Sequence, residues 1–312
     1  MTNLAVEFAG IKAKNPVFTA SGTCGFGQEL NEIFPIDKLG GIMVKGTTLQ
    51  PRLGNNTPRI AETPSGVINC VGLQNPGLEK VLEGPLPWIL QHDLAVLVNI
   101  SGGEPADYAE LARELDAVPG VAGLEVNISC PNVKAGGMAH GAHPETAAAV
   151  MKAVRAATNL PVVVKLSPNV TDIGEIAKAV EAEGADAVSL VNTFLSMVID
   201  VNRRKPLLGN IMGGLSGPAI RPIAVRMVWQ VAHSVKIPII GMGGISSGED
   251  ALQFMMAGAN AVAVGAATMV NPLAPVQIID EMAAWCEKEG VADINEIVGA
   301  ALPAGVRDCG CI

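Results

Sequence analysis

The sequence lacks the features of a membrane-spanning, secreted or nucleic-acid-binding protein. Its longest apolar runs, such as residues 261–270, are shorter than the roughly 18 to 20 residues that a membrane helix needs. Residues 1–8 have no basic flank and no long apolar segment, so we expect no signal peptide or amphipathic anchor, and a cytoplasmic location. A net charge of −9 argues against a nucleic-acid surface.

Closely spaced cysteines are also scarce. Six cysteines are scattered along 312 residues, which predicts free thiols in place of a disulfide framework. Only Cys309 and Cys311 are close together, and we interpret them as thiols of a C-terminal tail. His140 and His143 are close as well, but no third histidine stands near them in the sequence, so no metal site is expected.

Apolar residues and glycine are abundant. Apolar residues make up 49% of the chain, charged residues only 16%, and there are 35 glycines, which is enough for a large core under many tight turns. The length fits two average domains or one large barrel. A regular alternation of short apolar runs and helix-like segments favours a single domain over residues 1–312.

Eight short apolar runs each end in a polar residue or a glycine. They cover residues 17–20, 41–44, 94–98, 121–126, 161–164, 187–191, 237–240 and 261–264. Apolar residues spaced by three and four predict helices between them, over residues 108–117, 144–158, 173–184, 218–234 and 248–257. This order predicts the α/β class and a (β/α)8, or TIM, barrel.

Three further features are predicted around this barrel. Residues 4–8 and 11–14 are expected to form an N-terminal β-hairpin over its bottom. Residues 46–88 are too polar and proline-rich for an ordinary connection, so we expect an insertion after the second barrel strand that belongs to the active site. Ser246 and Glu249 are expected to form a capping box at a helix start.

Active sites of such barrels lie at the carboxyl ends of the strands. Reading off these ends gives Ser21, Lys45, Asn99, Asn127, Lys165, Asn192, Thr193, Gly243, Gly244 and Gly265. The glycines follow the last two strands, where backbone N–H groups commonly hold a phosphate. The two lysines are expected to supply positive charge to an anion or an electron-rich ring.

Asparagines and one cysteine complete the predicted site. Amide side chains offer donors and acceptors that match a pyrimidine-like or flavin-like ring. They are Asn69, Asn99, Asn127, Asn132 and Asn192. Cys130 follows a predicted strand and precedes a glycine-rich run, so we interpret it as a reactive thiol on a mobile loop. Together these residues fit a flavin mononucleotide enzyme that removes a proton with Cys130 while a hydride leaves to the flavin.

These residues closely resemble those of a known family, the dihydroorotate dehydrogenases, and within it the class 1B catalytic subunit. The matching segments stand in the family's order over nearly the whole chain. They are 19–23 (TASGT), 44–48 (VKGTT), 69–77 (NCVGLQNPG), 127–132 (NISCPN), 164–169 (VKLSPN), 191–193 (VNT), 213–217 (GGLSG) and the two terminal glycine loops.

The resemblance implies ligands and roles for individual residues. Residues expected around one FMN per chain are Ser21, Lys45, Gly46, Asn99, Asn127, Lys165, Val191, Gly217, Gly243, Gly244, Gly265 and Ala266. Those expected to hold dihydroorotate or orotate are Lys45, Asn69, Cys70, Val71, Gly72, Leu73, Asn127, Asn192 and Thr193. Cys130 would be the catalytic base of an enzyme of de novo pyrimidine synthesis. A membrane-bound relative carries serine at the position that corresponds to Cys130.

The resemblance also implies an electron-transfer partner. A second subunit would carry FAD and a [2Fe-2S] cluster and pass electrons to NAD, with a homodimer of this chain inside a heterotetramer. The sequence itself shows neither a compact four-cysteine cluster motif nor a GxGxxG fingerprint. Cys70 stands inside the segment expected to hold substrate, but the presence of a thiol there is not explained by the resemblance, and packing is the interpretation we favour for that side chain.

Three other functions remain open from the sequence. A class 1A enzyme would be a homodimer that uses fumarate directly. A flavin-free, phosphate-binding aldolase or isomerase would use Lys165 as a Schiff-base amine. A non-catalytic barrel would bind orotate without flavin or turnover.

Overall fold

The computed structural model describes residues 2–129 and 140–303, and its main strands close into a barrel. These strands are β3 (Val17–Thr19), β4 (Gly41–Met43), β7 (Ala95–Ile100), β8 (Gly123–Asn127), β9 (Val162–Lys165), β10 (Ala187–Leu190), β15 (Ile239–Met242) and β16 (Ala261–Val264). They pair in parallel in the order β10-β15-β16-β3-β4-β7-β8-β9. The predicted fold class is therefore confirmed, with each strand within two residues of its expected bounds at either end.

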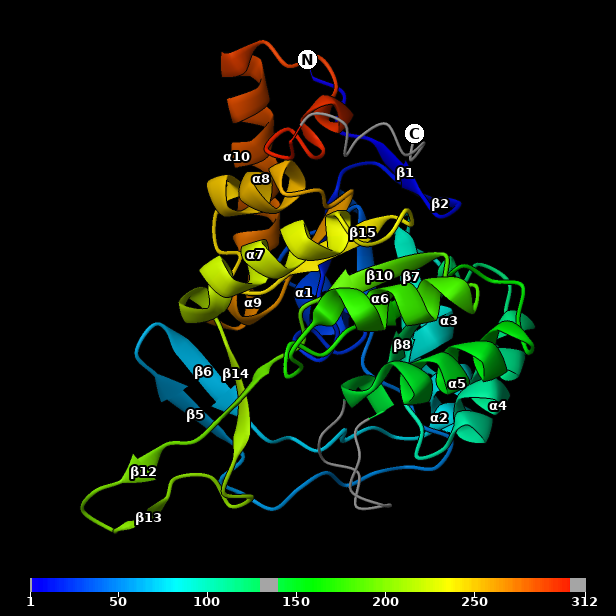
Figure 1. Ribbon diagram of the computed structural model, residues 1–312, viewed down its shortest axis with the longest axis vertical. Helices are drawn as coiled ribbons and strands as arrows, with labels where there is room; N and C mark the ends of the chain where they lie inside the picture. The colour runs from blue at the N-terminus through cyan, green and yellow to red at the C-terminus, as the bar shows by residue number, and fades with distance from the viewer. Residues whose placement is uncertain (1, 130–139, 304–312) are drawn as a thin grey trace.

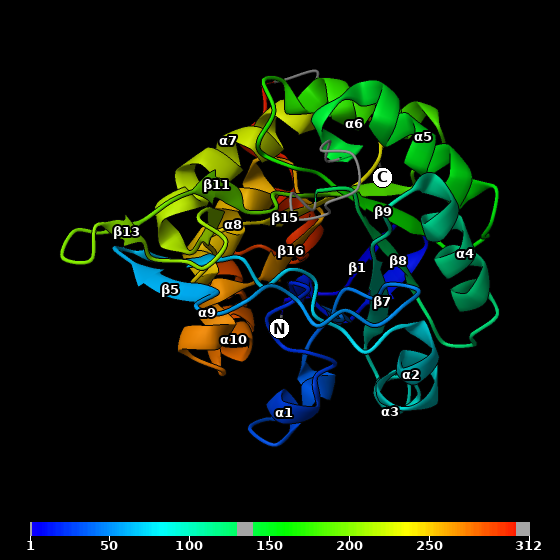
Figure 2. The same ribbon diagram turned by 90° about the horizontal axis from the view of Figure 1, so that it is seen from below.

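Helices surround the barrel, as Figure 2 shows from one end. The longer helices are α4 (Pro105–Asp116), α5 (Pro144–Arg155), α6 (Ile173–Ala182), α7 (Arg221–Ala232), α8 (Gly248–Met256) and α10 (Ala274–Glu289). The shorter ones are α1 (Gln28–Asn31), α2 (Leu78–Glu83), α3 (Pro85–Ile89) and α9 (Ala266–Val270). Four single-turn 3-10 helices are described, η1 (Ile36–Lys38), η2 (His140–Ala142), η3 (Pro218–Ile220) and η4 (Ile294–Ile297).

The five helices predicted from the sequence are all present, with one internal difference. The segment expected as one helix over residues 218–234 begins as the 3-10 turn η3 and continues as α7. Proline stands near the start of both, at Pro218 and Pro222. Backbone N–H groups in the first turn have no partner within the helix, so the missing N–H of proline costs no hydrogen bond there.

The predicted capping box before α8 is wrong by one residue. The N-cap is Ser247, whose side chain accepts from the backbone N–H of Asp250. The carboxylate of Asp250, rather than that of Glu249, accepts from both the backbone N–H and the hydroxyl of Ser246. Asp250 is held in this position by an ion pair with Arg221, which a local sequence pattern does not reveal.

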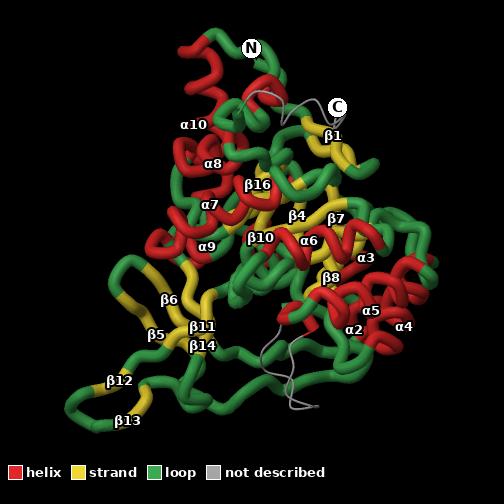
Figure 3. Tube along the Cα trace, in the orientation of Figure 1, coloured by secondary structure: helices red, strands yellow, loops and turns green. Residues whose placement is uncertain are grey.

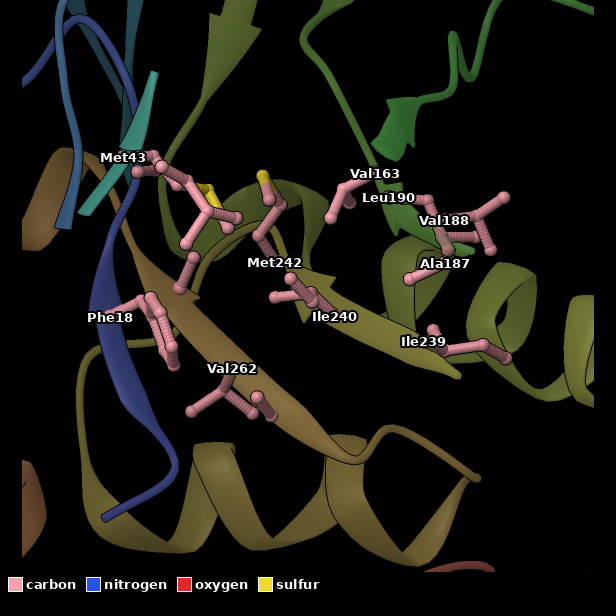
Figure 4. Packing of buried hydrophobic residues seen from close by; sticks show 14 of the residues in the cluster. Phe18, Met43, Val163, Ala187, Val188, Leu190, Ile239, Ile240, Met242 and Val262 are labelled. Atoms are coloured by element: carbon pink, nitrogen blue, oxygen red, sulfur yellow. The ribbon is translucent and has the colours of Figure 1, made fainter. Parts of the chain in front are cut away.

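Apolar side chains of the strands fill the core. Figure 4 shows some of them, including Phe18 of β3, Ile240 of β15 and Val262 of β16, all of which are buried. All eight barrel strands are buried at every position, as expected for parallel strands covered by helices on the outside. The barrel is thus a rigid support for the loops at its ends.

The N-terminal hairpin lies against the amino ends of the strands. Its strands are β1 (Val6–Phe8) and β2 (Ile11–Ala13). The side chain of Ile11 comes within 3.4 Å of the position that a Cβ would take on Gly123, the first residue of β8. In Figure 1 the hairpin is in the upper part of the molecule, away from the small sheet described next. The predicted position over the bottom of the barrel is therefore confirmed.

A second, antiparallel sheet lies at the other end of the molecule (Figures 1 and 3). The predicted insertion contributes β5 (Ile60–Thr63) and β6 (Gly66–Asn69). A second excursion, between β10 and α7, contributes β11 (Phe194–Ser196) and β14 (Gly213–Ser216), and the order is β11-β14-β6-β5. A two-stranded arm, β12 (Ile199–Asp200) and β13 (Lys205–Pro206), extends from it. This second excursion was not predicted.

Among the described residues, none of the helices combines the length and the apolar character needed to cross a membrane.

Candidate active site

A cavity of about 230 Å³ lies at the carboxyl ends of the barrel strands. Every residue for which the resemblance implies contact with FMN lines it. The residues expected to hold substrate also line it, with the exception of Cys70. The fold thus gathers strand ends that are far apart in the sequence, and the roles of these residues as ligand contacts remain predictions.

The small sheet forms part of the wall of this cavity. Val67 and Asn69 of β6 line it together with Gly214 and Ser216 of β14. The Asn69 amide also lies 3.4 Å from the carbonyl oxygen of Gly214, which joins the two excursions at the cavity. The predicted link between the insertion and the active site therefore has a structural basis.

Cys70 does not face the cavity. Its side chain is fully buried in a small apolar cluster with Ile68 and Leu208. In a strand-like segment, alternate side chains point to opposite faces, so neighbours of Cys70 line the cavity while Cys70 packs behind them. Cys70 is thus the one expected substrate contact outside the cavity lining, which agrees with the packing interpretation of its thiol.

A buried polar network lies inside the barrel next to the cavity. Glu125 of β8 has no exposed surface, and its Oε2 accepts from Nδ2 of Asn99 at 2.6 Å. Its Oε1 accepts from Oγ of Ser189 at 2.8 Å. Nζ of Lys165 lies 3.7 Å from Oε2. The opposite charges of Lys165 and Glu125 offset part of the cost of burying each.

Asn99 directs an acceptor toward the cavity. Its Oδ1 is buried and has no hydrogen-bond partner among the described residues. A Cβ on Gly46, which lines the cavity, would lie only 2.8 Å from this oxygen. A buried acceptor without a partner costs about 1–3 kcal/mol. A ligand that donates an N–H at this point would remove that cost.

Asn127 organises the edge of the cavity at the end of β8. Its Oδ1 accepts from the backbone N–H of Ser129 at 3.1 Å and lies 3.4 Å from Nδ2 of Asn192. Its backbone carbonyl accepts from the hydroxyl of Tyr108 at 2.9 Å. The hydroxyl of Ser129 donates to the carbonyl of Lys165 at 2.9 Å. The chain is therefore anchored immediately before Cys130.

Cys130, the predicted base, and Asn132 lie outside the described residues. The nearest described residues in sequence are Ser129 and His140. The His140 ring nitrogen Nε2 lies 2.9 Å from the carbonyl oxygen of Gly103, and the ring packs edge-on against Tyr108. Within residues 2–129 and 140–303, no group of three or more His, Cys, Asp or Glu side chains is placed to hold a metal ion.

The two terminal glycine loops form another part of the cavity wall. Gly243 and Gly244 have φ values of +124° and +81°, which other residues rarely adopt. A Cβ on Gly244 would also lie 2.7 Å from the carbonyl oxygen of Gly217. Only glycine fits here without displacing the facing loop.

Backbone donors in these loops suit a phosphate. None of the described residues accepts a hydrogen bond from the backbone N–H of Gly244, Gly265 or Ala266. The start of α8 is different, because the N–H of Gly248 donates to the carboxylate of Glu281 at 2.5 Å. A phosphate contact is therefore expected at Gly244 and at the start of α9, where Gly265 is the N-cap and Ala266 the first residue, and not at the start of α8.

Cys24 follows Thr23, which lines the cavity, but its own thiol is buried and is not part of the lining. Its Sγ donates to the hydroxyl of Thr19 at 3.2 Å, and burial raises the pKa of its thiol to about 11. Within the described residues, the free cysteines Cys24, Cys70 and Cys286 are all buried. This fits the prediction of scattered, unpaired thiols.

Sequence reasoning missed Glu125 and Ser189 as members of the site. A signal was present for Glu125, because it is the one charged residue in the apolar run 121–126. A carboxylate in a buried strand is rare unless it is paired. Its partners come from three other strands and could not be assigned from local sequence.

Comparison with known proteins agrees with this architecture. The sequence profile of the family described as dihydroorotate dehydrogenase matches residues 3–285. The chain is 57% identical over 299 residues to the "Dihydroorotate dehydrogenase B (NAD(+)), catalytic subunit" of Desulforamulus reducens, covering 96% of this chain and 98% of that protein.

Two further relatives carry the same description. The protein of Desulforudis audaxviator is 57% identical over 301 residues, covering 96% of this chain and 98% of the relative. That of Geobacillus sp. strain WCH70 is 51% identical over 311 residues, covering 100% and 99%. The chain belongs to the dihydroorotate dehydrogenase family.

Proposed function

We propose that the cavity binds FMN and dihydroorotate together, and that Cys130 removes the proton that leaves during oxidation. The reaction itself follows from the family and the relatives. The chain is the catalytic subunit of an NAD-linked dihydroorotate dehydrogenase B and oxidises dihydroorotate to orotate in pyrimidine biosynthesis. Its family is flavin-dependent, and FMN as the particular flavin is our proposal.

One observation carries the choice of FMN. A single cavity contains both an unpartnered amide acceptor, Oδ1 of Asn99, and the backbone N–H groups of Gly244, Gly265 and Ala266, for which no described residue serves as acceptor. The first suits a ring that carries an N–H, and the second suits a phosphate. FMN has both groups in one molecule.

Lysines and asparagines that line the cavity are suited to binding the substrate and the flavin ring. Lys45 and Lys165 bring positive charge to the cavity, suited to the substrate carboxylate and to a ring that gains electrons. Asn127 and Asn192 present amide groups to the N–H and C=O edges of a pyrimidine ring. FMN held among these residues would supply the acceptor for the hydride that leaves the carbon bearing the carboxylate.

Cys130 is proposed to act on the other leaving hydrogen. Its Sγ takes the proton from the ring methylene next to a carbonyl, while the C–H electrons form the new double bond. Support comes from its neighbour Ser129, which hydrogen bonds both Asn127 and Lys165 at the cavity edge. A base must lie within hydrogen-bond reach of the proton that it removes.

A partner subunit is implied by the words "catalytic subunit" in the names of the relatives. We propose that this partner carries FAD and a [2Fe-2S] cluster, and that two copies of this chain form the core of a heterotetramer. A cytoplasmic location remains an expectation from the sequence. The NAD-linked relatives favour this electron path over direct use of fumarate, and family membership argues against the flavin-free aldolase and the non-catalytic barrel.

The visible spectrum of the purified protein, before and after anaerobic addition of dihydroorotate, tests the proposal. We expect a flavin band that bleaches on addition of substrate, and FMN as the flavin released on denaturation. FAD in the released fraction would contradict the choice of FMN. A colourless protein that FMN does not reconstitute would contradict flavin binding by this chain.

A further inference from the structure

We propose that Glu125 is a positioning residue that sets both the charge and the hydrogen-bonding direction of the flavin site. This inference rests on the proposed binding of FMN in the cavity. Glu125 is fully buried, does not line the cavity, and contacts two residues that do, Asn99 and Lys165. It acts on the ligand only through them.

The first step concerns charge. Lys165 has only 7% of its side chain exposed and lines the cavity, where a buried ammonium group would carry an uncompensated charge. Glu125 supplies the opposite charge at 3.7 Å. Because this distance exceeds a hydrogen bond, the ammonium is balanced by the carboxylate without donating a short bond to it. Its N–H donors can therefore be directed to a ligand.

The second step concerns the direction of an amide. An ionised carboxylate only accepts hydrogen bonds, so the NH₂ group of Asn99 must face Glu125 and the oxygen must face away. The 2.6 Å contact between Nδ2 and Oε2 shows this arrangement. The Asn99 oxygen is thereby presented on the Gly46 side, where it has no described partner. Glu125 thus selects a ligand that donates to Asn99.

A third contact holds the carboxylate itself in place. Ser189 donates to Oε1 at 2.8 Å, while Oε2 faces both Asn99 and Lys165. Both oxygens are therefore occupied by groups from three neighbouring or facing strands. A glutamine in this position would have an NH₂ group, which donates and does not accept, in place of one carboxylate oxygen, so it could not accept from all three groups.

The variant Glu125→Gln tests this inference, with Glu281→Gln as a matched control. Glu281 caps α8 at Gly248 and does not line the cavity, so its loss tests general destabilisation by the same substitution. We expect Glu125→Gln to weaken FMN binding by about tenfold. We also expect a higher midpoint potential of bound FMN, because loss of a negative charge favours the more negative reduced flavin. The expected rise is about 30 mV, which for a two-electron couple corresponds to a tenfold gain in the affinity for reduced FMN relative to oxidised FMN.

A second measurement uses the protein without flavin. Thermal unfolding of Glu125→Gln, Lys165→Met and the double variant reports whether the two buried charges are coupled. We expect the double variant to lose less stability than the two single losses added together, because it leaves neither charge unpaired. The comparison of unfolding temperatures still tests the charge pairing if Glu125→Gln alone is too unstable for measurements of FMN binding.

The outcomes separate the two proposals. If the wild-type protein binds no FMN, the proposed cofactor is wrong, and the unfolding measurements still decide whether Glu125 balances Lys165. If FMN binds, but Glu125→Gln changes affinity and potential no more than Glu281→Gln does, the positioning role is overturned. Additive losses of stability in the double variant would overturn the charge pairing.

Discussion

The side-chain amide of Asn192 lies 3.4 Å from the side-chain oxygen of Asn127, although 65 residues separate them in the chain. Both line the cavity, and the same Asn127 oxygen accepts from the backbone of Ser129. Asn127 therefore connects the predicted substrate contact at Asn192 with the segment that leads into Cys130. Replacing it should disturb substrate binding and the base together.

We expect Asn127→Ala to lower kcat/KM for dihydroorotate by about tenfold to a hundredfold. The substitution removes the acceptor for Ser129 and Asn192, and each lost hydrogen bond costs about 0.5–1.5 kcal/mol. Steady-state kinetics with a defined acceptor measures the effect. Asn295→Ala is the control, because Asn295 bonds Ala5 and Asp293 and does not line the cavity. Equal kinetics for the two variants would contradict the role of Asn127.

A pair of glycines tests the predicted phosphate contact. Gly244 has a φ of +81° and would place a Cβ 2.7 Å from the carbonyl oxygen of Gly217. Gly290 has a similar φ of +72° at the end of α10, with no atom within 4 Å of a Cβ. Alanine at either position bears the cost of a left-handed backbone, about 1–2 kcal/mol. Only Gly244→Ala should also displace the cavity wall.

The measurement is the FMN content of each purified variant. We expect Gly290→Ala to retain a full complement of FMN and to unfold at a slightly lower temperature. Gly244→Ala should lose most of its FMN under the same conditions. Retention of FMN by both variants would show that this loop does not hold the phosphate.

Much of the barrel could be predicted because its signals are local. A buried parallel strand is a short apolar run, and the polar or glycine residue that ends it stands next to it in the sequence. Lys45 and Lys165, for example, each follow such a run directly. Strand bounds shifted where the chain required it: β15 begins at Ile239, after Pro238, which has no N–H for the ladder.

What could not be predicted depends on contacts between distant segments. Strand β14 pairs with β6, so the register joins Gly214 to Asn69 across 145 residues. Its short, glycine-rich sequence has no alternation that identifies a strand. Glu125 was missed for the same reason, since the meaning of a buried carboxylate depends on Lys165 and Ser189, far along the chain.

Asp116 predicts a dependence of stability on pH. Its carboxylate accepts from the hydroxyl of Thr158 at 2.6 Å and from the backbone N–H of Asn159 at 2.7 Å. These bonds hold the pKa of Asp116 below its ordinary value. A depressed folded pKa means that the stabilisation is present above the unfolded pKa, about 3.9, and is lost as the pH falls through the folded value.

Thermal unfolding of Asp116→Asn against wild type, from neutral to acidic pH, checks this. We expect the variant to unfold at a lower temperature at pH 7. The difference should shrink as the pH falls below about 4, because the wild-type carboxylate is then protonated as well. A constant difference across this range would show that the charge of Asp116 does not contribute.

Cys130→Ser is the most direct test of the proposed base. A hydroxyl is a much weaker acid than a thiol, so at neutral pH far less of it is available as a base, and general base catalysis is worth about 10²–10⁴ in rate. We expect anaerobic flavin reduction by dihydroorotate to slow by at least about a hundredfold at pH 7 and to recover as the pH is raised. Cys24→Ser is the matched control, because burial raises the pKa of Cys24 to about 11 and its thiol does not line the cavity. Unchanged reduction in Cys130→Ser, or an equal loss in Cys24→Ser, would mean that the proton leaves to another group.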